Sequence, residues 1–471
     1  MSGRQLLLVV GVFILSACGR TSGAGAGPAH EPFPSADATL VLRGRLIDGT
    51  GAQPVENGVV VVTGDRIACA GRAAECNIPR GARVLDTDGG TILPGLIDLH
   101  VHARPHYMAW FLAAGVTTVR DANNSLSQVQ ANIATEIRPR IFWSGPLLDG
   151  PKTIMRLFGA EGVMRPTATN LGDAVTLEVT TPEEARAAVD SLAARGASVV
   201  KLYEQIPLAV YQAAAERARE RGLPVMTDLG MHTTRGLSGA EVDALQAIAA
   251  GVRTIEHASG YALAYQRLGG DPTRLPLDPV LVDSLARVTV RSGTAVVPTL
   301  SVFYAYSDSV TNVGDLPVGE RFAHFPKEMR DFFEQGAARR TPTSRGNSRN
   351  GYLLASAVAR RVRELGGVVG AGSDSPAGVF NIPGGAIHRE MELLVREGMT
   401  PVEAIQAATG AAAKILGRSE LGTIRPGAVA DLVVVDGNPA EDVRATRRIR
   451  TVIQAGRTLP LGSLFPVADG S

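Results

Sequence analysis

The sequence predicts an α/β protein: a (β/α)8 barrel of the TIM type with a small β-sandwich built from both ends of the chain. Two observations predict it. The middle of the chain alternates short β-type runs with helical stretches, which is the pattern of parallel βα units. The flanking segments 39–90 and 420–460 instead contain β-type runs separated by Gly, Asp and Asn turns. A chain of 471 residues is long enough for one large domain or two ordinary ones.

We expect the first element, residues 1–18, to be an export signal rather than part of the fold. Arg4 precedes an apolar stretch from Leu6 to Leu15, and small residues lead to Cys18. This pattern resembles a bacterial lipoprotein signal, in which the peptidase cuts before the cysteine and lipid is attached to it. An ordinary secretory signal or a plain N-terminal anchor is the alternative. Residues 19–38 then predict a flexible tether, so we expect an exported lipoprotein on the periplasmic side of the inner or outer membrane, attached only through its lipid.

The next element, segment 39–90, supplies the first half of the β-sandwich. It contains the runs TLVLRGRLIDG, NGVVVVTGDRIACAG and ARVLDTDGGTILPG, with turn residues between them. It also holds Cys69 and Cys76, the two cysteines outside the signal. Export makes a disulfide permissible, whereas free cysteines are often buried. A small-loop disulfide and two separate buried thiols therefore both stay open.

The barrel is expected over residues 91–419, where we count eight β-type runs. Helical stretches that end at Gly separate several of them, and the active site of such a barrel lies at the C-terminal ends of its strands. Residues 145–180 and 301–350 are long irregular stretches that would emerge at that end, as substrate walls or a lid. The runs are GLIDLHVH, VTTVRDA, RIFWSG, SVVKLY, PVMTDLG, RTIEHA, TAVVPTL and GVVGAGSD.

Side chains that can bind a metal end four of these runs. His100 and His102 stand at positions i and i+2, so strand alternation sends both imidazoles to the same face. Lys201 ends the fourth run and is costly to bury as a cation, so it either reaches solvent or loses its charge, for example as a carbamate. His257 and Asp374 end the sixth and eighth runs. Each alone has an ordinary explanation, such as a rim residue or a helix cap, but their coincidence predicts a metal site.

The same runs carry a family resemblance. The segments LPGLIDLHVH, GVTTVRDA, VVKLY, GVRTIEHAS, GAGSDS and HREMELLVREGMTPVEAIQAATGAAAKILG resemble the metal-dependent amidohydrolase superfamily, nearest to its imidazolonepropionase-like and prolidase-like branch. The similarity extends over nearly all residues from about 39 to 460. The resemblance implies one or two Zn²⁺ ions per chain, with Mn²⁺ or another divalent ion as the alternative.

The resemblance also implies a role for each of these side chains. His100, His102, a carboxylated Lys201 (N6-carboxylysine) and Asp374 would hold the first ion. The carbamate, His257 and a ligand after the fifth strand would hold the second. Asp374 would in addition take the proton of the attacking water and return it to the leaving amine.

The fifth strand departs from the family pattern. The family usually has a histidine where this strand ends, whereas TDLG places Asp228 there and His232 follows four residues later. Because Asp is itself a zinc ligand, we expect Asp228 to hold the second ion; His232 as the ligand and a site for one metal are the alternatives. Tyr203, two residues after Lys201, would face the site as a donor to the substrate. His106 would either line its entrance or be exposed.

We therefore expect a metal-dependent hydrolase that cleaves amide C–N bonds in dipeptides, N-acyl amino acids or cyclic amides. An esterase or lactonase of the same superfamily and a non-catalytic binding lipoprotein on this scaffold are the alternatives, because fold alone does not choose among them. With 47 basic and 46 acidic residues, the net charge of +1 gives no indication of a nucleic-acid partner. The expected partner is a small-molecule amide or dipeptide, and the sequence leaves homo-oligomer formation open.

Overall fold

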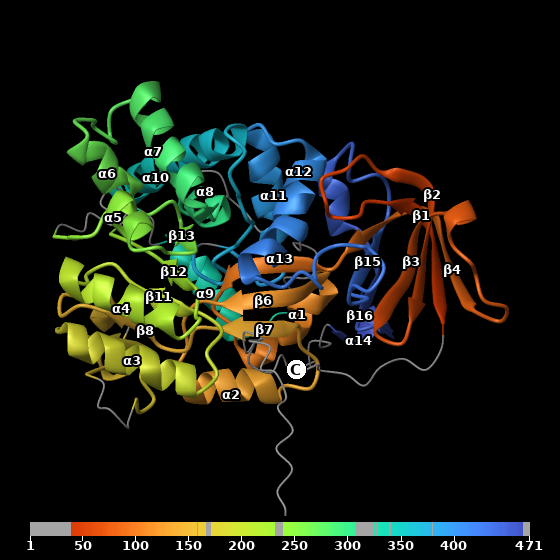
Figure 1. Ribbon diagram of the computed structural model, residues 1–471, viewed down its shortest axis with the longest axis horizontal. Helices are drawn as coiled ribbons and strands as arrows, with labels where there is room; N and C mark the ends of the chain where they lie inside the picture. Colours follow the sequence, from red (N-terminus) through yellow and green to blue (C-terminus); the bar gives the residue numbers. More distant parts are fainter. Residues whose placement is uncertain are drawn as a thin grey trace, which may run out of the picture.

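In the computed structural model, the chain forms a barrel surrounded by helices, with a β-sheet body at one end (Figure 1). The structure describes residues 39–157, 159–165, 171–230, 239–307, 325, 327–338, 341–378 and 380–464. The predicted export signal with Cys18, the tether and His232 lie outside the described residues. Each helix in the described part of the chain is too short or too polar to cross a membrane.

Both ends of the chain contribute to one seven-stranded sheet, in the order β17-β16-β15-β4-β1-β2-β3. The C-terminal strand β15 pairs with β4, and β4 pairs in parallel with β1, so the two ends of the sequence meet at the middle of the sheet. The sequence predicts this composite β-body. Its strands are β1 (Leu40–Leu46), β2 (Val55–Thr63), β3 (Arg66–Arg72), β4 (Arg83–Pro94), β15 (Leu432–Val435), β16 (Ile449–Gln454) and β17 (Arg457–Leu459).

The run of valines at 59–62 is buried throughout because apolar side chains cover the sheet on both faces. Val59 and Val61 pack in one cluster with Cys76, whereas Val60 and Val62 pack in another on the opposite face. Cys69 and Cys76 form a disulfide. Of the two alternatives that the sequence left open, the structure therefore has the disulfide, which ties the segment after β3 to the sheet.

The barrel strands coincide with the predicted runs, and the TIM-barrel prediction is confirmed. The eighth run forms no regular strand: it closes the ring through isolated parallel bridges, from Val369 to Val296 of β14 and from Ser375 to Val101 of β5. The other seven are β5 (Leu96–Val101), β6 (Val116–Asp121), β7 (Arg140–Trp143), β11 (Val200–Leu202), β12 (Val225–Thr227), β13 (Thr254–Glu256) and β14 (Ala295–Val297).

Helices cover the outside of the barrel (Figure 1). Local sequence explains where several begin: Thr181 caps α3, its side chain accepts from Glu184 N, and Pro182 occupies the first turn. The helices are α1 (Met108–Ala113), α2 (Leu126–Ala134), α3 (Pro182–Ala194), α4 (Leu208–Glu220), α5 (Ala244–Ala249), α6 (Tyr261–Arg267), α7 (Pro279–Ser292), α8 (Leu300–Tyr306), α9 (Lys327–Ala338), α10 (Pro342–Glu364), α11 (Ala386–Arg396), α12 (Pro401–Ala407), α13 (Gly410–Leu416) and α14 (Leu461–Leu464).

The two stretches that we expected to be irregular contain regular elements, so that expectation was wrong. Residues 145–180 hold β8 (Leu147–Asp149), β9 (Val163–Met164) and β10 (Thr176–Glu178), which extend the barrel sheet beside β11. Residues 301–350 hold most of α8, all of α9 and the start of α10. Strands this short leave no periodic pattern, and the polar start of α10 is helical because Thr341 caps it.

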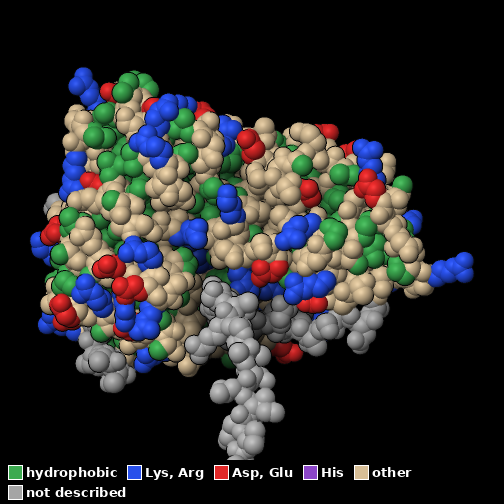
Figure 2. Space-filling model, in the orientation of Figure 1, with side chains coloured by type: hydrophobic (Ala, Val, Ile, Leu, Met, Phe, Trp, Pro, Cys, Tyr) green, Lys and Arg blue, Asp and Glu red, His purple; other side chains and the backbone are tan. Residues whose placement is uncertain are grey.

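Charged side chains of both signs are interspersed over the described part of the face in Figure 2. The surface potential of this face is therefore mixed, and its field has no single direction that would steer a highly charged polymer.

Candidate metal centre

The C-terminal ends of the barrel strands surround a cavity of about 180 Å³. This is the end of a parallel barrel at which active sites lie. Five of the predicted metal ligands line the cavity, and the sixth, His100, is fully buried beside it. The lining residues are His102, Asn123, Leu147, Met155, Lys201, Tyr203, Asp228, His257, Asp374 and Ala377.

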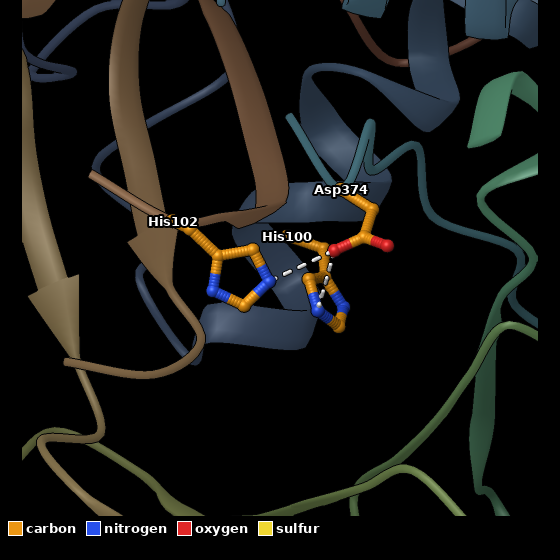
Figure 3. Close-up of side chains that lie close together, drawn as sticks. All are labelled: His100, His102 and Asp374. Atoms are coloured by element: carbon orange, nitrogen blue, oxygen red, sulfur yellow. Dashed lines mark hydrogen bonds and ion pairs between the residues drawn. The ribbon is translucent and has the colours of Figure 1, made fainter. Parts of the chain in front are cut away.

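Three of the six predicted ligands form a compact group (Figure 3). His100 lies on β5, His102 follows its end, and Asp374 lies on the segment that closes the barrel. Asp374 Oδ1 is 3.0 Å from His102 Nε2 and 3.5 Å from His100 Nε2. One ligand atom from each residue lies within 4.8 Å of the other two. Two imidazoles and a carboxylate at this spacing suit a divalent ion such as Zn²⁺.

A second pair of side chains lines the same cavity. His257 Nε2 lies 3.2 Å from Asp228 Oδ2, and both residues are buried. Burial alone would lower the pKa of His257, but the neighbouring carboxylates of Asp228 and Asp374 together hold it above its ordinary value. The residue that replaces the expected histidine at the end of the fifth strand therefore does point at the centre, beside the sixth-strand histidine.

Lys201 lies between the two groups. Its Nζ is 3.2 Å from His100 Nε2 and 3.8 Å from Asp228 Oδ2, and the side chain is 2% exposed. The alternative of a lysine that reaches solvent at the barrel rim is thereby excluded. Lys201 thus contacts one predicted ligand from each group. A group attached to its Nζ would lie near both predicted metal positions.

Two further contacts fix the orientation of the buried histidines. His100 Nδ1 is 2.8 Å from Glu256 Oε2, and His257 Nδ1 is 2.6 Å from Thr299 Oγ1. If each Nδ1 carries the proton and donates it, each Nε2 presents its lone pair to the cavity, as a metal ligand requires. Arg120 Nη2 in turn donates to Glu256 Oε1 at 2.7 Å, which neutralises that buried carboxylate.

Of the two predicted substrate contacts, Tyr203 and His106, only Tyr203 is at the cavity. Tyr203 lines the cavity. His106 is exposed on a 3-10 turn (Pro105–Tyr107) and is absent from the lining residues, because that turn sends the neighbouring Tyr107 inward instead. The Tyr107 hydroxyl donates to the carbonyl oxygen of His102 and so supports the first ligand pair.

Sequence reasoning missed three residues at this site: Glu256, Thr299 and Asn123. Asn123 lines the cavity at the end of β6, and its Oδ1 accepts from Leu147 N at 3.4 Å. No described residue accepts a hydrogen bond from its Nδ2. A signal existed for Glu256, an acidic residue inside the apolar run RTIEHA, whereas Asn123 sits among other turn-type residues and has none.

Comparisons with known proteins place the chain among hydrolases. The model of the amidohydrolase family matches residues 91–459. An ochratoxinase of Aspergillus niger is 25% identical over 478 aligned residues, which cover 88% of this chain and 85% of the relative. An imidazolonepropionase of Anaeromyxobacter dehalogenans is 40% identical over 74 residues, which cover 14% of this chain and 17% of the relative. The crystal structure of a putative prolidase from Bifidobacterium longum superposes with a TM-score of 0.66 at 26% identity, over 91% of this chain and 98% of that one.

Proposed function

This chain belongs to the amidohydrolase family and is a hydrolase that acts on amide C–N bonds, and we propose that it does so with one or two divalent metal ions. His100, His102 and Asp374 would hold the first ion, and Asp228 and His257 the second. Lys201, carboxylated on Nζ, would supply oxygen ligands to both. The substrates are small amides: dipeptides, N-acyl amino acids or cyclic amides.

The observation that carries the proposal is the position of Lys201. Its Nζ lies within 4 Å of a ligand atom in each of the two groups, at 3.2 Å from His100 and 3.8 Å from Asp228. A binding protein without catalysis would gain nothing from a lysine buried between His100 and Asp228, because burying the cation is costly. The donor set of imidazole nitrogens and carboxylate oxygens fits Zn²⁺ or Mn²⁺.

The side chains divide the chemical work among them. A bound divalent ion supplies Lewis acidity, which lowers the pKa of a water and polarises the amide carbonyl. Asp374 takes the proton from the attacking water and delivers it to the nitrogen of the leaving amine. Asp374 Oδ1 lies 3.0 Å from His102 Nε2 and 3.5 Å from His100 Nε2, so an ion held by these residues would also fix the carboxylate, and the surrounding apolar wall limits the access of other water.

One wall of the cavity suits an uncharged, partly apolar acyl group of the substrate. Leu147 and Tyr203 form an apolar cluster with Ile154, against which Met155 packs. Asn123 Nδ2 and the Tyr203 hydroxyl are the polar groups of this wall, and both are neutral donors suited to a carbonyl oxygen of the substrate. We propose that the acyl part of the amide binds here.

Metal analysis combined with a substrate library tests the function. Purified protein should contain divalent metal and hydrolyse at least one N-acyl amino acid, dipeptide or cyclic amide, and chelation should abolish turnover that Zn²⁺ or Mn²⁺ restores. Parallel ester and lactone substrates distinguish the two alternatives within the superfamily. Saturable binding of these amides without any turnover by the metal-loaded protein would instead identify a binding lipoprotein.

We also propose that the protein is exported and lipid-anchored at Cys18. The signal-like sequence before Cys18 supports this, and so does the disulfide between Cys69 and Cys76, since such bonds persist in oxidising compartments. Full-length protein should fractionate with membranes, and Cys18→Ser should release or mislocalise it. A Cys18→Ser protein that stays membrane-bound with its signal uncleaved would identify a plain N-terminal anchor.

A further inference from the structure

We propose that Glu390 is a positioning residue that, through the first turn of α8, holds one ligand from each metal group in place. The two ligands are His257 and Asp374. The inference rests on the proposed metal-dependent function. Glu390 itself lies on α11 and does not line the cavity, so it acts through other residues.

The first step is the contact between Glu390 and α8. The opening N–H groups of a helix have no partner within the helix and need one outside it. At α8 the preceding residue, Thr299, makes no side-chain cap, so this common solution is not used. Glu390 Oε2 accepts from Ser301 N at 2.7 Å. The carboxylate of α11 therefore takes the place of the missing cap.

The second step leads from this turn to His257. Because Glu390 caps α8, the Thr299 hydroxyl is released from capping and lies 2.6 Å from His257 Nδ1. Thr299 has φ +46 and ψ +48, a left-handed conformation that is uncommon for a β-branched residue. Such a conformation persists only where its surroundings enforce it. The hydrogen bond from Ser301 N to Glu390 is one such constraint.

The third step leads from the same turn to Asp374. Ser301 Oγ donates to the carbonyl oxygen of Ser373, the residue before Asp374, at 3.0 Å. Ser373 is also bound by Asp98, whose carboxylate accepts from Ser373 Oγ at 2.6 Å and from Ser373 N at 2.8 Å. Ser373 is therefore fixed by Ser301 and by Asp98. Because Asp374 is the next residue, these contacts also restrict the position of its backbone.

The environment of Glu390 shows that its carboxylate is committed to this contact. The side chain is fully buried, and Oε1 has no hydrogen-bond partner among the described residues. A buried carboxyl group with one oxygen unpaired is costly. Its other oxygen accepts its hydrogen bond from the turn that carries Thr299 and Ser301.

Zinc titration of the metal-depleted full chain against a competing chelator tests the inference, with folding checked by circular dichroism. Residues that orient metal ligands typically contribute 10- to 100-fold to metal affinity. Glu390→Ala should weaken both binding steps by about this factor, and Glu390→Gln, which keeps an acceptor oxygen, by clearly less. Thr299→Val, of nearly the same shape, should weaken the second step alone, and Ser301→Ala the first alone.

Glu392→Ala is the matched control, because Glu392 lies on the same helix but pairs with Arg447 instead. It should bind Zn²⁺ as the wild type does. A folded Glu390→Ala protein with wild-type affinity at both steps would overturn the inference. If that variant does not fold, wild-type affinities in both Thr299→Val and Ser301→Ala would overturn it equally. A wild-type protein that binds no Zn²⁺ would instead contradict the proposed function.

Discussion

Asp228 places a negative charge at a position where a histidine side chain would be neutral. A carboxylate favours harder ions than an imidazole does, so Mn²⁺ should compete better with Zn²⁺ at this position. We predict that Asp228→Ala lowers the metal content from about two ions toward one per chain, because the second ion loses a ligand. Asp228→His should retain both ions and shift the preference toward Zn²⁺. Elemental analysis of proteins purified with metal present measures both effects.

His232→Ala is the control for this prediction, since His232 is the competing ligand in the sequence. Its metal content should equal that of the wild type. A loss of one ion from His232→Ala, or two ions retained in Asp228→Ala, would show that Asp228 is not a ligand of the second ion.

Lys201 makes a second prediction at this scale. If its carbamate bridges the two groups, Lys201→Ala should lose metal and activity together, because both ions lose a shared ligand. Small carboxylic acids such as acetate should restore part of both by occupying the vacated space. Metal content and turnover are measured on the same samples. Full metal content with normal turnover in Lys201→Ala would rule out the bridge.

The residues that the sequence revealed share one property, which is their place at the end of a β-type run. His100, Lys201 and Asp374 could be found in this way because parallel strands bring their ends together. Thr299 and Glu390 could not, because their roles depend on partners 42 and 89 residues away in the chain. Nothing in a single sequence indicates which distant side chain meets which.

At the scale of elements, the eighth barrel run differs most from expectation. It was predicted as a strand, yet only isolated bridges link it to β14 and β5. Its glycines allow the close approach: a Cβ at Gly370 would lie 2.4 Å from Leu99 Cδ1. The position of the run was predictable from its apolar residues and terminal Asp374. Its irregular pairing was not, because periodicity does not report how near two backbones lie.

This close packing makes a prediction for Gly372. A Cβ there would lie 3.0 Å from His100 Cβ and 2.7 Å from Val297 Cγ1, so one of these elements has to shift. We expect Gly372→Ala to cost about 1–3 kcal/mol of stability, as overpacking does, and to weaken metal binding by displacing His100. Thermal unfolding with and without Zn²⁺ measures both.

Gly346→Ala provides the comparison, because Gly346 lies on α10 and a Cβ there meets nothing within 4 Å. That variant should be as stable as the wild type or slightly more so, since alanine favours a helix. Equal behaviour of the two variants would contradict the close approach at Gly372.

At the scale of the whole molecule, buried polar contacts join the barrel to the composite sheet. Arg140 of β7 pairs with Asp431 at 2.5 Å, and both are buried. Asp431 Oδ1 also accepts from Ala455 N at 2.8 Å. Asp431, the residue before β15, therefore has a structural role at the junction. The sequence predicted that the two chain ends form one body, but not which residues fasten that body to the barrel.

His388 makes a second set of buried polar contacts between the barrel and the composite sheet. It lies on α11, with Nε2 2.9 Å from the carbonyl oxygen of Ala114 and Nδ1 2.9 Å from Thr446 Oγ1. Thr446 belongs to a 3-10 helix (Val443–Arg447) between β15 and β16. Burial lowers the pKa of His388 from 6.5 to about 4, because the charged form would lose its hydration.

The sign of the resulting pH dependence follows from proton binding. Between pH 6.5 and about 4 the unfolded chain binds a proton at His388 that the folded chain does not, so stability falls as pH falls through this window. The contribution is complete above pH 6.5. At about 1.4 kcal/mol per pKa unit, the total loss is roughly 3 kcal/mol.

We therefore predict that His388→Gln is less stable than the wild type at neutral pH, since it disturbs two buried contacts, but less sensitive to acid. The melting temperatures of both proteins should be measured from pH 7.5 to 4. All other titrating groups are shared, so the difference between the two curves isolates His388. That difference should shrink as pH falls below 6.5 and level off near pH 4. A constant difference would mean that the folded and unfolded pKa values are equal, and that His388 joins the two bodies without responding to pH.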